Sequence, residues 1–160
     1  MILLNFGKGA RMRKTIQKKL NDNQTILAKV TGLSKEQLSR AWFSDILFEK
    51  GSIIGISIPG YPAYRNIIKA LDLKTYLIPT KREDNFQLTP KLLKNLPIML
   101  DGLIISSPSN PCGTIIPDEQ ITQISNICID KGITLISDEI YHGIEYEKKQ
   151  LNTAFGINNQ

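Results

Sequence analysis

Four short apolar runs, separated by helix-length or polar segments, constrain the fold of this chain most. They lie at residues 52–58, 75–78, 101–106 and 133–136. Short apolar runs bounded by Pro, Gly or Asp are typical of buried strands in a parallel sheet. Residues 61–71 and 117–131 are predicted to form helices between them. This alternation predicts an α/β fold with a mostly parallel sheet and right-handed crossovers.

Several residues predict where the helices begin and end. Thr89 is placed to cap a short helix that has Pro90 in its first position. Pro117 opens the helix of residues 117–131, and Gly132 stops it. One face of that helix carries an apolar stripe of Ile121, Ile124, Ile127 and Cys128. The segment 81–87 is polar and is predicted to be a loop.

The first fifty residues predict less regular structure. We expect helices at 10–20 and 34–49 and a short strand at 26–31, with Ser34 as the N-cap of the second helix. Basic residues dominate before the first acid, Asp22, and they give the first helix a basic face. A solvated helix face explains this charge. The alternatives are a targeting helix or a nucleic-acid patch, but interleaved aromatics and a binding motif are lacking.

Composition excludes several classes of protein. The 160 residues are 41% hydrophobic and 22% charged, with a net charge of +5, which suits one globular domain. No apolar run approaches the roughly 20 residues that a membrane span needs, so we expect a cytoplasmic protein with neither membrane nor nucleic acid as partner. Cys112 and Cys128 lack ligand spacing, and His142 is the single histidine. We therefore expect no metal site.

Polar and aromatic residues follow three of the predicted strands. Asn110 comes after the run 101–106, Asp138 comes after 133–136, and Tyr141 follows three residues later. Tyr61 comes after 52–58 through a Pro-Gly turn, where its ring could stack on a flat cofactor. Ligands of open α/β sheets bind beyond the carboxyl ends of the strands. Each residue alone could serve packing, a turn or a helix cap, but their coincidence favours a shared ligand site.

Three motifs in these positions resemble a known family. P-G-Y-P-A-Y (59–64), S-P-S-N-P-C-G-T (107–114) and S-D-E-I-Y (137–141) resemble, in order and spacing, the class I/II aminotransferases. These are pyridoxal-phosphate enzymes of the aspartate-aminotransferase fold. The resemblance implies a three-layer α/β fold with helices on both faces of the sheet. It also implies that residues 1–160 are part of the large, cofactor-binding domain, without the small C-terminal domain.

The resemblance implies a role for each residue at the strand ends. Asp138 matches the aspartate that pairs with the pyridine nitrogen and keeps the ring protonated. Tyr141 and Asn110 match the residues that bond the phenolic oxygen of the ring, and Asn110 also steers the substrate carboxylate. Tyr61 matches the aromatic residue that stacks on the ring face.

Two parts of the family pattern are weak or missing. The cofactor phosphate would lie at a helix N-terminus, where only Gly32 and Ser34 match, and Glu36 would repel an anion. In the family, the lysine that forms the Schiff base belongs to a Ser-x-x-Lys segment well after the Asp-x-x-Tyr motif. This sequence contains no such segment after Tyr141. Lys148 and Lys149 lie too close to Tyr141, so no catalytic residue is assigned.

Three functions follow from this pattern. The first is transfer of an amino group between an amino acid and a 2-oxo acid. We expect this truncated chain to be inactive alone. Its full-length relatives are expected to be homodimers. The second is a non-catalytic remnant, or an assembly half that pairs with a separately encoded C-terminal part through a sheet edge exposed after Ile136. The third is a nucleotide-binding domain. It ranks last because this sequence lacks both glycine-rich phosphate-binding motifs of such domains.

Overall fold

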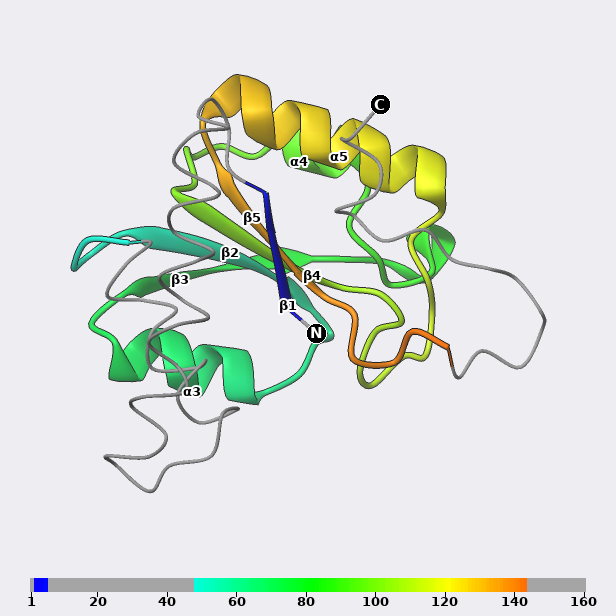
Figure 1. The fold of residues 1–160 in the computed structure, drawn as a ribbon, viewed down its shortest axis with the longest axis horizontal. Helices are drawn as coiled ribbons and strands as arrows, with labels where there is room; N and C mark the ends of the chain where they lie inside the picture. The colour runs from blue at the N-terminus through cyan, green and yellow to red at the C-terminus, as the bar shows by residue number, and fades with distance from the viewer. Residues whose placement is uncertain (1, 6–47, 144–160) are drawn as a thin grey trace, which may run out of the picture.

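The computed structural model describes residues 2–5 and 48–143, which form a five-stranded sheet with flanking helices (Figure 1). The strands lie in the order β1-β5-β4-β2-β3. Their bounds are β1 Ile2–Asn5, β2 Ile53–Ile58, β3 Lys74–Pro79, β4 Gly102–Ser106 and β5 Thr134–Asp138. Strands β2 to β5 pair in parallel, whereas β1 runs antiparallel to β5.

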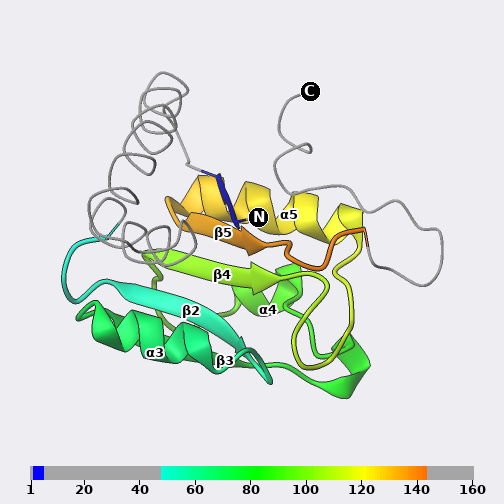
Figure 2. The same ribbon diagram turned by 60° about the horizontal axis from the view of Figure 1, so that its bottom comes forward.

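Helices cover both faces of the sheet, which confirms the three-layer α/β architecture. Helix α3, Ala63–Ala70, lies on one face, and α4, Pro90–Lys94, and α5, Asp118–Lys131, lie on the other (Figures 1 and 2). A short 3-10 helix at Arg82–Asp84 interrupts the segment 81–87, which was predicted to be a loop throughout.

Most predicted boundaries agree with the structure to within two residues. Thr89 Oγ1 accepts a hydrogen bond from the Leu92 backbone N–H at 3.2 Å, as expected of an N-cap. Gly132 ends α5 with a φ of 69°, a conformation that glycine adopts without strain. Helix α3 begins at Ala63, so Tyr61 lies in the preceding turn. The predicted segments at 10–20 and 26–31, most of 34–49, and Ser34 lie outside the described residues.

The alternation of side chains along the strands divides the core into two layers. Leu103 and Ile105 of β4 pack with α4 and α5 in the larger cluster. Ile104 between them joins the smaller cluster, which includes Ile68 of α3 and Ile136 of β5. Each strand therefore presents alternate residues to different helices, and this parity continues to the strand ends.

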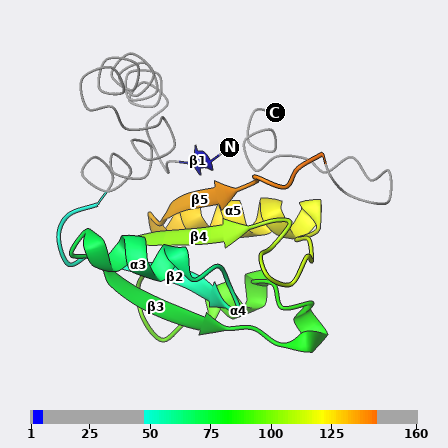
Figure 3. The same ribbon diagram turned by 90° about the horizontal axis from the view of Figure 1, so that it is seen from below.

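The prediction of an exposed sheet edge after Ile136 is wrong for the described fold. Strand β1 pairs with β5 over four residues, from Ile2 opposite Asp138 to Asn5 opposite Leu135. Figure 3 shows β1 beside β5, at the opposite side of the sheet from β3. The sequence did not predict this strand because four residues carry little periodicity and their partner is distant in the chain.

None of the described helices combines the length and the apolar character that crossing a bilayer requires.

Candidate functional site

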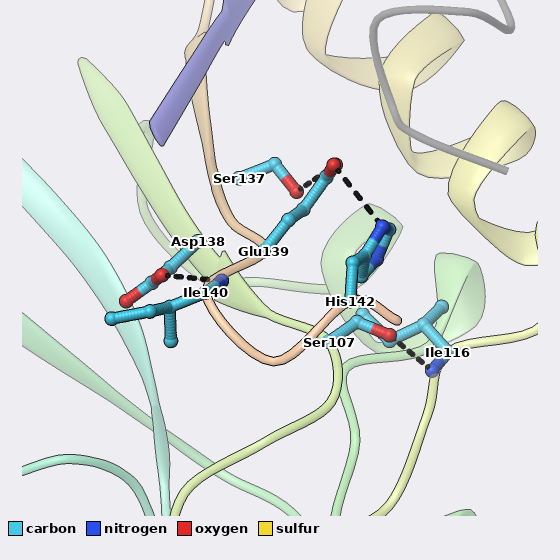
Figure 4. Close-up of polar contacts among 7 residues, drawn as sticks. All are labelled: Ser107, Ile116, Ser137, Asp138, Glu139, Ile140 and His142. Atoms are coloured by element: carbon cyan, nitrogen blue, oxygen red, sulfur yellow. Dashed lines mark hydrogen bonds and ion pairs between the residues drawn. The ribbon is translucent and has the colours of Figure 1, made fainter. Parts of the chain in front are cut away.

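Asp138 is the last residue of β5, and its side chain is directed toward the α3 face of the sheet. It shares the parity of Ile136, which packs in the α3-side cluster. Its Oδ2 accepts a hydrogen bond from the hydroxyl of Tyr64, which lies in the first turn of α3. Its Oδ1 accepts one from the backbone N–H of Ile140 at 3.2 Å (Figure 4). Both carboxylate oxygens are therefore held in place at the carboxyl end of the sheet.

Tyr64 is the contact of Asp138 that sequence reasoning missed. Burial raises the pKa of Tyr64 above its ordinary value of 10.0, and the hydrogen bond to Asp138 and the charge of that carboxylate raise it further. The side chain of Ser106, at the end of β4, lowers this pKa and partly offsets these effects. The Tyr64 hydroxyl therefore stays protonated and remains a donor at neutral pH. The signal that could have found it is its position three residues after Tyr61 at a helix start.

Asn110 and Tyr141 lie together, as the strand-end pattern predicts. The Asn110 amide Nδ2 donates to the Tyr141 hydroxyl at 3.4 Å, and both side chains are half-buried. Tyr141 also raises the pKa of Tyr64 electrostatically. The pair of Asn110 and Tyr141 is therefore a neighbour of the contact between Tyr64 and Asp138. The ends of β4 and β5 thus deliver an amide, a phenol and a carboxylate to one region.

The loop that carries Asn110 is held by buried hydrogen bonds. The hydroxyl of Ser107, which is buried, accepts a hydrogen bond from the Ile116 backbone N–H at 3.0 Å (Figure 4). The side chain of Gln87, also buried, donates to the backbone carbonyl of Thr114 at 2.7 Å. These contacts close the loop at its base and fix the place of Asn110. The sequence assigned no role to Ser107 or Gln87.

Tyr61 is exposed, with 39% of its surface accessible, and its ring meets that of Tyr64 edge to face. The ring centroids are 5.5 Å apart and the planes meet at 84°. This geometry is one of the favoured arrangements for an aromatic pair. The ring of Tyr61 is therefore held by a neighbouring ring while part of its surface stays accessible to a ligand.

Glu139 lies on the opposite side of the chain from Asp138. Its side chain is directed away from that of Asp138 in Figure 4 and is buried. Glu139 Oε1 accepts a hydrogen bond from the Ser137 hydroxyl at 2.9 Å, and Oε2 lies 3.5 Å from His142 Nδ1. Glu139 therefore anchors the turn after β5 and does not face the Asp138 site.

The arrangement offers a held carboxylate, two neutral hydrogen-bond donors and an exposed aromatic ring. Such a set can bind a flat, partly cationic heterocycle that carries an oxygen acceptor. Within the described ranges, no group of three or more His, Cys, Asp or Glu side chains could hold a metal ion.

A family model for aminotransferases of class I and II matches residues 11–159. The chain belongs to this family. The valine–pyruvate aminotransferase of Mycobacterium tuberculosis is 40% identical over 100 residues, which are 62% of this chain and 26% of that protein. The aspartate aminotransferase of Bacillus sp. strain YM-2 is 30% identical over 144 residues, which are 88% of this chain and 36% of that protein.

Solved structures agree with this family assignment. An aminotransferase from Mycobacterium tuberculosis has a TM-score of 0.70 and 30% identity, covering 87% of this chain and 39% of that one. The aromatic aminotransferase from Pyrococcus horikoshii has a TM-score of 0.67 and 26% identity, covering 74% and 32%. The chain therefore spans well under half the length of these class I and II aminotransferases.

Proposed function

We propose that the strand ends form the ring-binding part of a pyridoxal-phosphate site. The observation that carries this proposal is the Asp138 carboxylate, half-buried and held through both oxygens at the carboxyl end of β5. Each carboxylate oxygen has a second acceptor position. Asp138 would accept the N–H of the pyridine ring at one of these positions and keep that nitrogen protonated.

The neighbouring residues fit the rest of the ring. Asn110 and Tyr141 lie 3.4 Å apart, so one oxygen acceptor can receive hydrogen bonds from both. We propose that they bind the phenolic oxygen, that Tyr61 stacks on the ring face, and that Asn110 also orients the substrate carboxylate. Ser34 is proposed for the phosphate by resemblance alone, because it lies outside the described residues.

Membership of the class I and II family supports a proposal for the reaction class. We propose amino-group transfer between an amino acid and a 2-oxo acid as the activity of the complete protein. When bound, pyridoxal phosphate supplies the electron sink that this chemistry needs. The two relatives are named for different amino acids, valine and aspartate. The proposal therefore names amino acids and 2-oxo acids as the substrate class and no individual substrate.

We propose that the 160 residues act as part of the large domain, bind the cofactor without a covalent bond and do not transaminate alone. No Ser-x-x-Lys segment follows Asp138 in the sequence. Dimer formation would be a property of the complete protein. The alternative, an assembly half that adds a strand beside β5, is less well supported because β1 takes that position.

The test is pyridoxal-phosphate binding by the 160-residue chain, followed by fluorescence and by borohydride reduction. We expect saturable binding that Asp138→Asn weakens about tenfold, since a charge-assisted hydrogen bond is lost. Asp72→Asn is the matched control, because Asp72 is exposed and pairs with Lys50 away from the site. Equal affinity in both variants would remove Asp138 from the site. Stable attachment to one lysine after reduction would contradict non-covalent binding.

A further inference from the structure

We propose that Tyr64 is a positioning residue that fixes the Asp138 carboxylate and, through the same side chain, supports the ring of Tyr61. This inference rests on the proposed cofactor site and adds to it Tyr64, which ends the P-G-Y-P-A-Y motif but was assigned no role from the sequence. In this arrangement, one phenol sets the distance between the group that would bind the ring nitrogen and the group that would stack on the ring.

Three contacts of Tyr64 carry the inference. Its hydroxyl donates to Asp138 Oδ2, across 74 positions of the sequence. Its ring meets Tyr61 edge to face with centroids 5.5 Å apart. Its backbone N–H donates to the Tyr61 carbonyl oxygen at 3.2 Å, which closes the turn before α3. Tyr64 thus joins the start of α3 to the end of β5 and holds Tyr61 by both backbone and ring.

The protonation state of Tyr64 suits this role. Burial, and then the neighbouring Asp138, raises the pKa of the phenol above its ordinary value. The hydroxyl therefore remains a donor to Asp138 at neutral pH. With Tyr64 on Oδ2 and the Ile140 N–H on Oδ1, rotation of the carboxylate would break two hydrogen bonds. The carboxylate is thus oriented before any ligand arrives, which lowers the ordering cost of binding.

The contact between Tyr64 and Asp138 can be tested without cofactor by a double-mutant cycle in the full chain. We expect Tyr64→Phe and Asp138→Ala each to raise the unfolding equilibrium constant in urea. Both substitutions remove the same hydrogen bond. The increase in the unfolding equilibrium constant of the double variant should therefore be about tenfold smaller than the product of the two single increases. Asp138→Val, which also lacks a side-chain acceptor, replaces Asp138→Ala if the latter does not fold. Tyr76→Phe, on β3, is the control partner and should show coupling within twofold of unity.

The role toward the cofactor is tested with pyridoxal phosphate labelled with ¹⁵N in the ring. In Tyr64→Phe we expect about tenfold weaker binding and loss of the ring-nitrogen proton at lower pH than in the wild type. Tyr76→Phe should change neither quantity. A purely structural role of Tyr64 would lower stability without moving the titration of the ring nitrogen.

The outcomes separate this inference from the proposed function. If the wild type does not bind pyridoxal phosphate, the proposed function fails, and the mutant cycle alone decides whether Tyr64 holds Asp138. If the cycle shows no coupling, or if Tyr64→Phe binds and titrates like the wild type, the positioning role is overturned although the cofactor site stands.

Discussion

Consecutive residues at the end of β5 serve opposite faces of the sheet. Asp138 meets Tyr64 on the α3 side, whereas Ser137 and Glu139 bond each other on the other side. A strand that ends in this way can present a carboxylate to a ligand while the next carboxylate secures the turn. The local motif S-D-E-I-Y thus combines Asp138, which we propose as a ligand-binding residue, with Glu139, which secures the turn.

At the residue scale, the strand-end rule predicted which side chains of the candidate site lie near one another. Asn110 and Tyr141 lie together because parallel strands end at one edge of the sheet. Tyr64 and Gln87 were not predicted, because their contacts depend on how α3 and the loop after β3 pack. Their partners Asp138 and Thr114 lie 74 and 27 positions away. Such contacts leave no local pattern in the sequence.

The hydrogen bond of the buried Ser107 hydroxyl should contribute measurably to the free energy of unfolding. Ser107→Ala leaves the Ile116 N–H without its acceptor, and an unsatisfied buried group costs about 1–3 kcal/mol. Urea unfolding measures this loss. Ser109→Ala in the same loop is the control, because Ser109 and its partner Thr114 are half-buried and water can replace the bond. Equal effects of both changes would contradict the assigned role of Ser107.

The Cys128 thiol should make stability fall at alkaline pH. Burial raises the pKa of Cys128 from its ordinary value of 9.0 to about 12. The folded chain therefore holds the proton that the unfolded chain loses, so this stabilisation is complete below about pH 9 and declines toward pH 12.

The check for Cys128 is urea unfolding at pH 7 to 11 in the wild type and in Cys128→Ala. The difference in free energy of unfolding should narrow as pH rises, by up to about 1.4 kcal/mol per pH unit. A constant difference would show that the thiol does not titrate as inferred.

Cys112, which is only half-buried, should react with a thiol reagent well before Cys128 does.

At the scale of elements, the helices and parallel strands were the most predictable part. Each has its own apolar run or stripe, and Thr89 and Gly132 mark where helices begin and end. The boundaries that differed were those set by tertiary contacts. Helix α3 begins after Tyr61, whose carbonyl accepts the Tyr64 N–H, and β5 extends to Asp138 because β4 and β1 pair with it.

The cap of α4 gives a prediction at this scale. Thr89→Ala removes the acceptor of the Leu92 N–H and should lower the free energy of unfolding by about 1 kcal/mol. Thr89→Ser keeps the hydroxyl and should recover most of this loss. Both are measured by thermal or urea unfolding. A serine variant as unstable as the alanine variant would assign the effect to the threonine methyl group and not to the cap.

For the molecule as a whole, β1 determines which strands form the edges of the described sheet. Its pairing with β5 leaves β3 as the other edge of the described sheet. Of the Leu3 and Leu4 N–H groups, one faces β5, so substituting proline at both removes a backbone donor to β5 and should release β5 for pairing with other chains. Sedimentation analysis should then show a mass that rises with concentration. An unchanged sedimentation profile would mean that β1 does not protect this edge.

Strand β1 also sets an order of events during synthesis. Ile2 leaves the ribosome well before its partner Asp138, which is made only after β2, β3 and β4. Those three strands can pair while the chain is still growing, whereas β1 must wait for β5. The last step of sheet formation therefore closes the longest loop, and the rate of that step governs how long the edge beside Asp138 stays open to other chains.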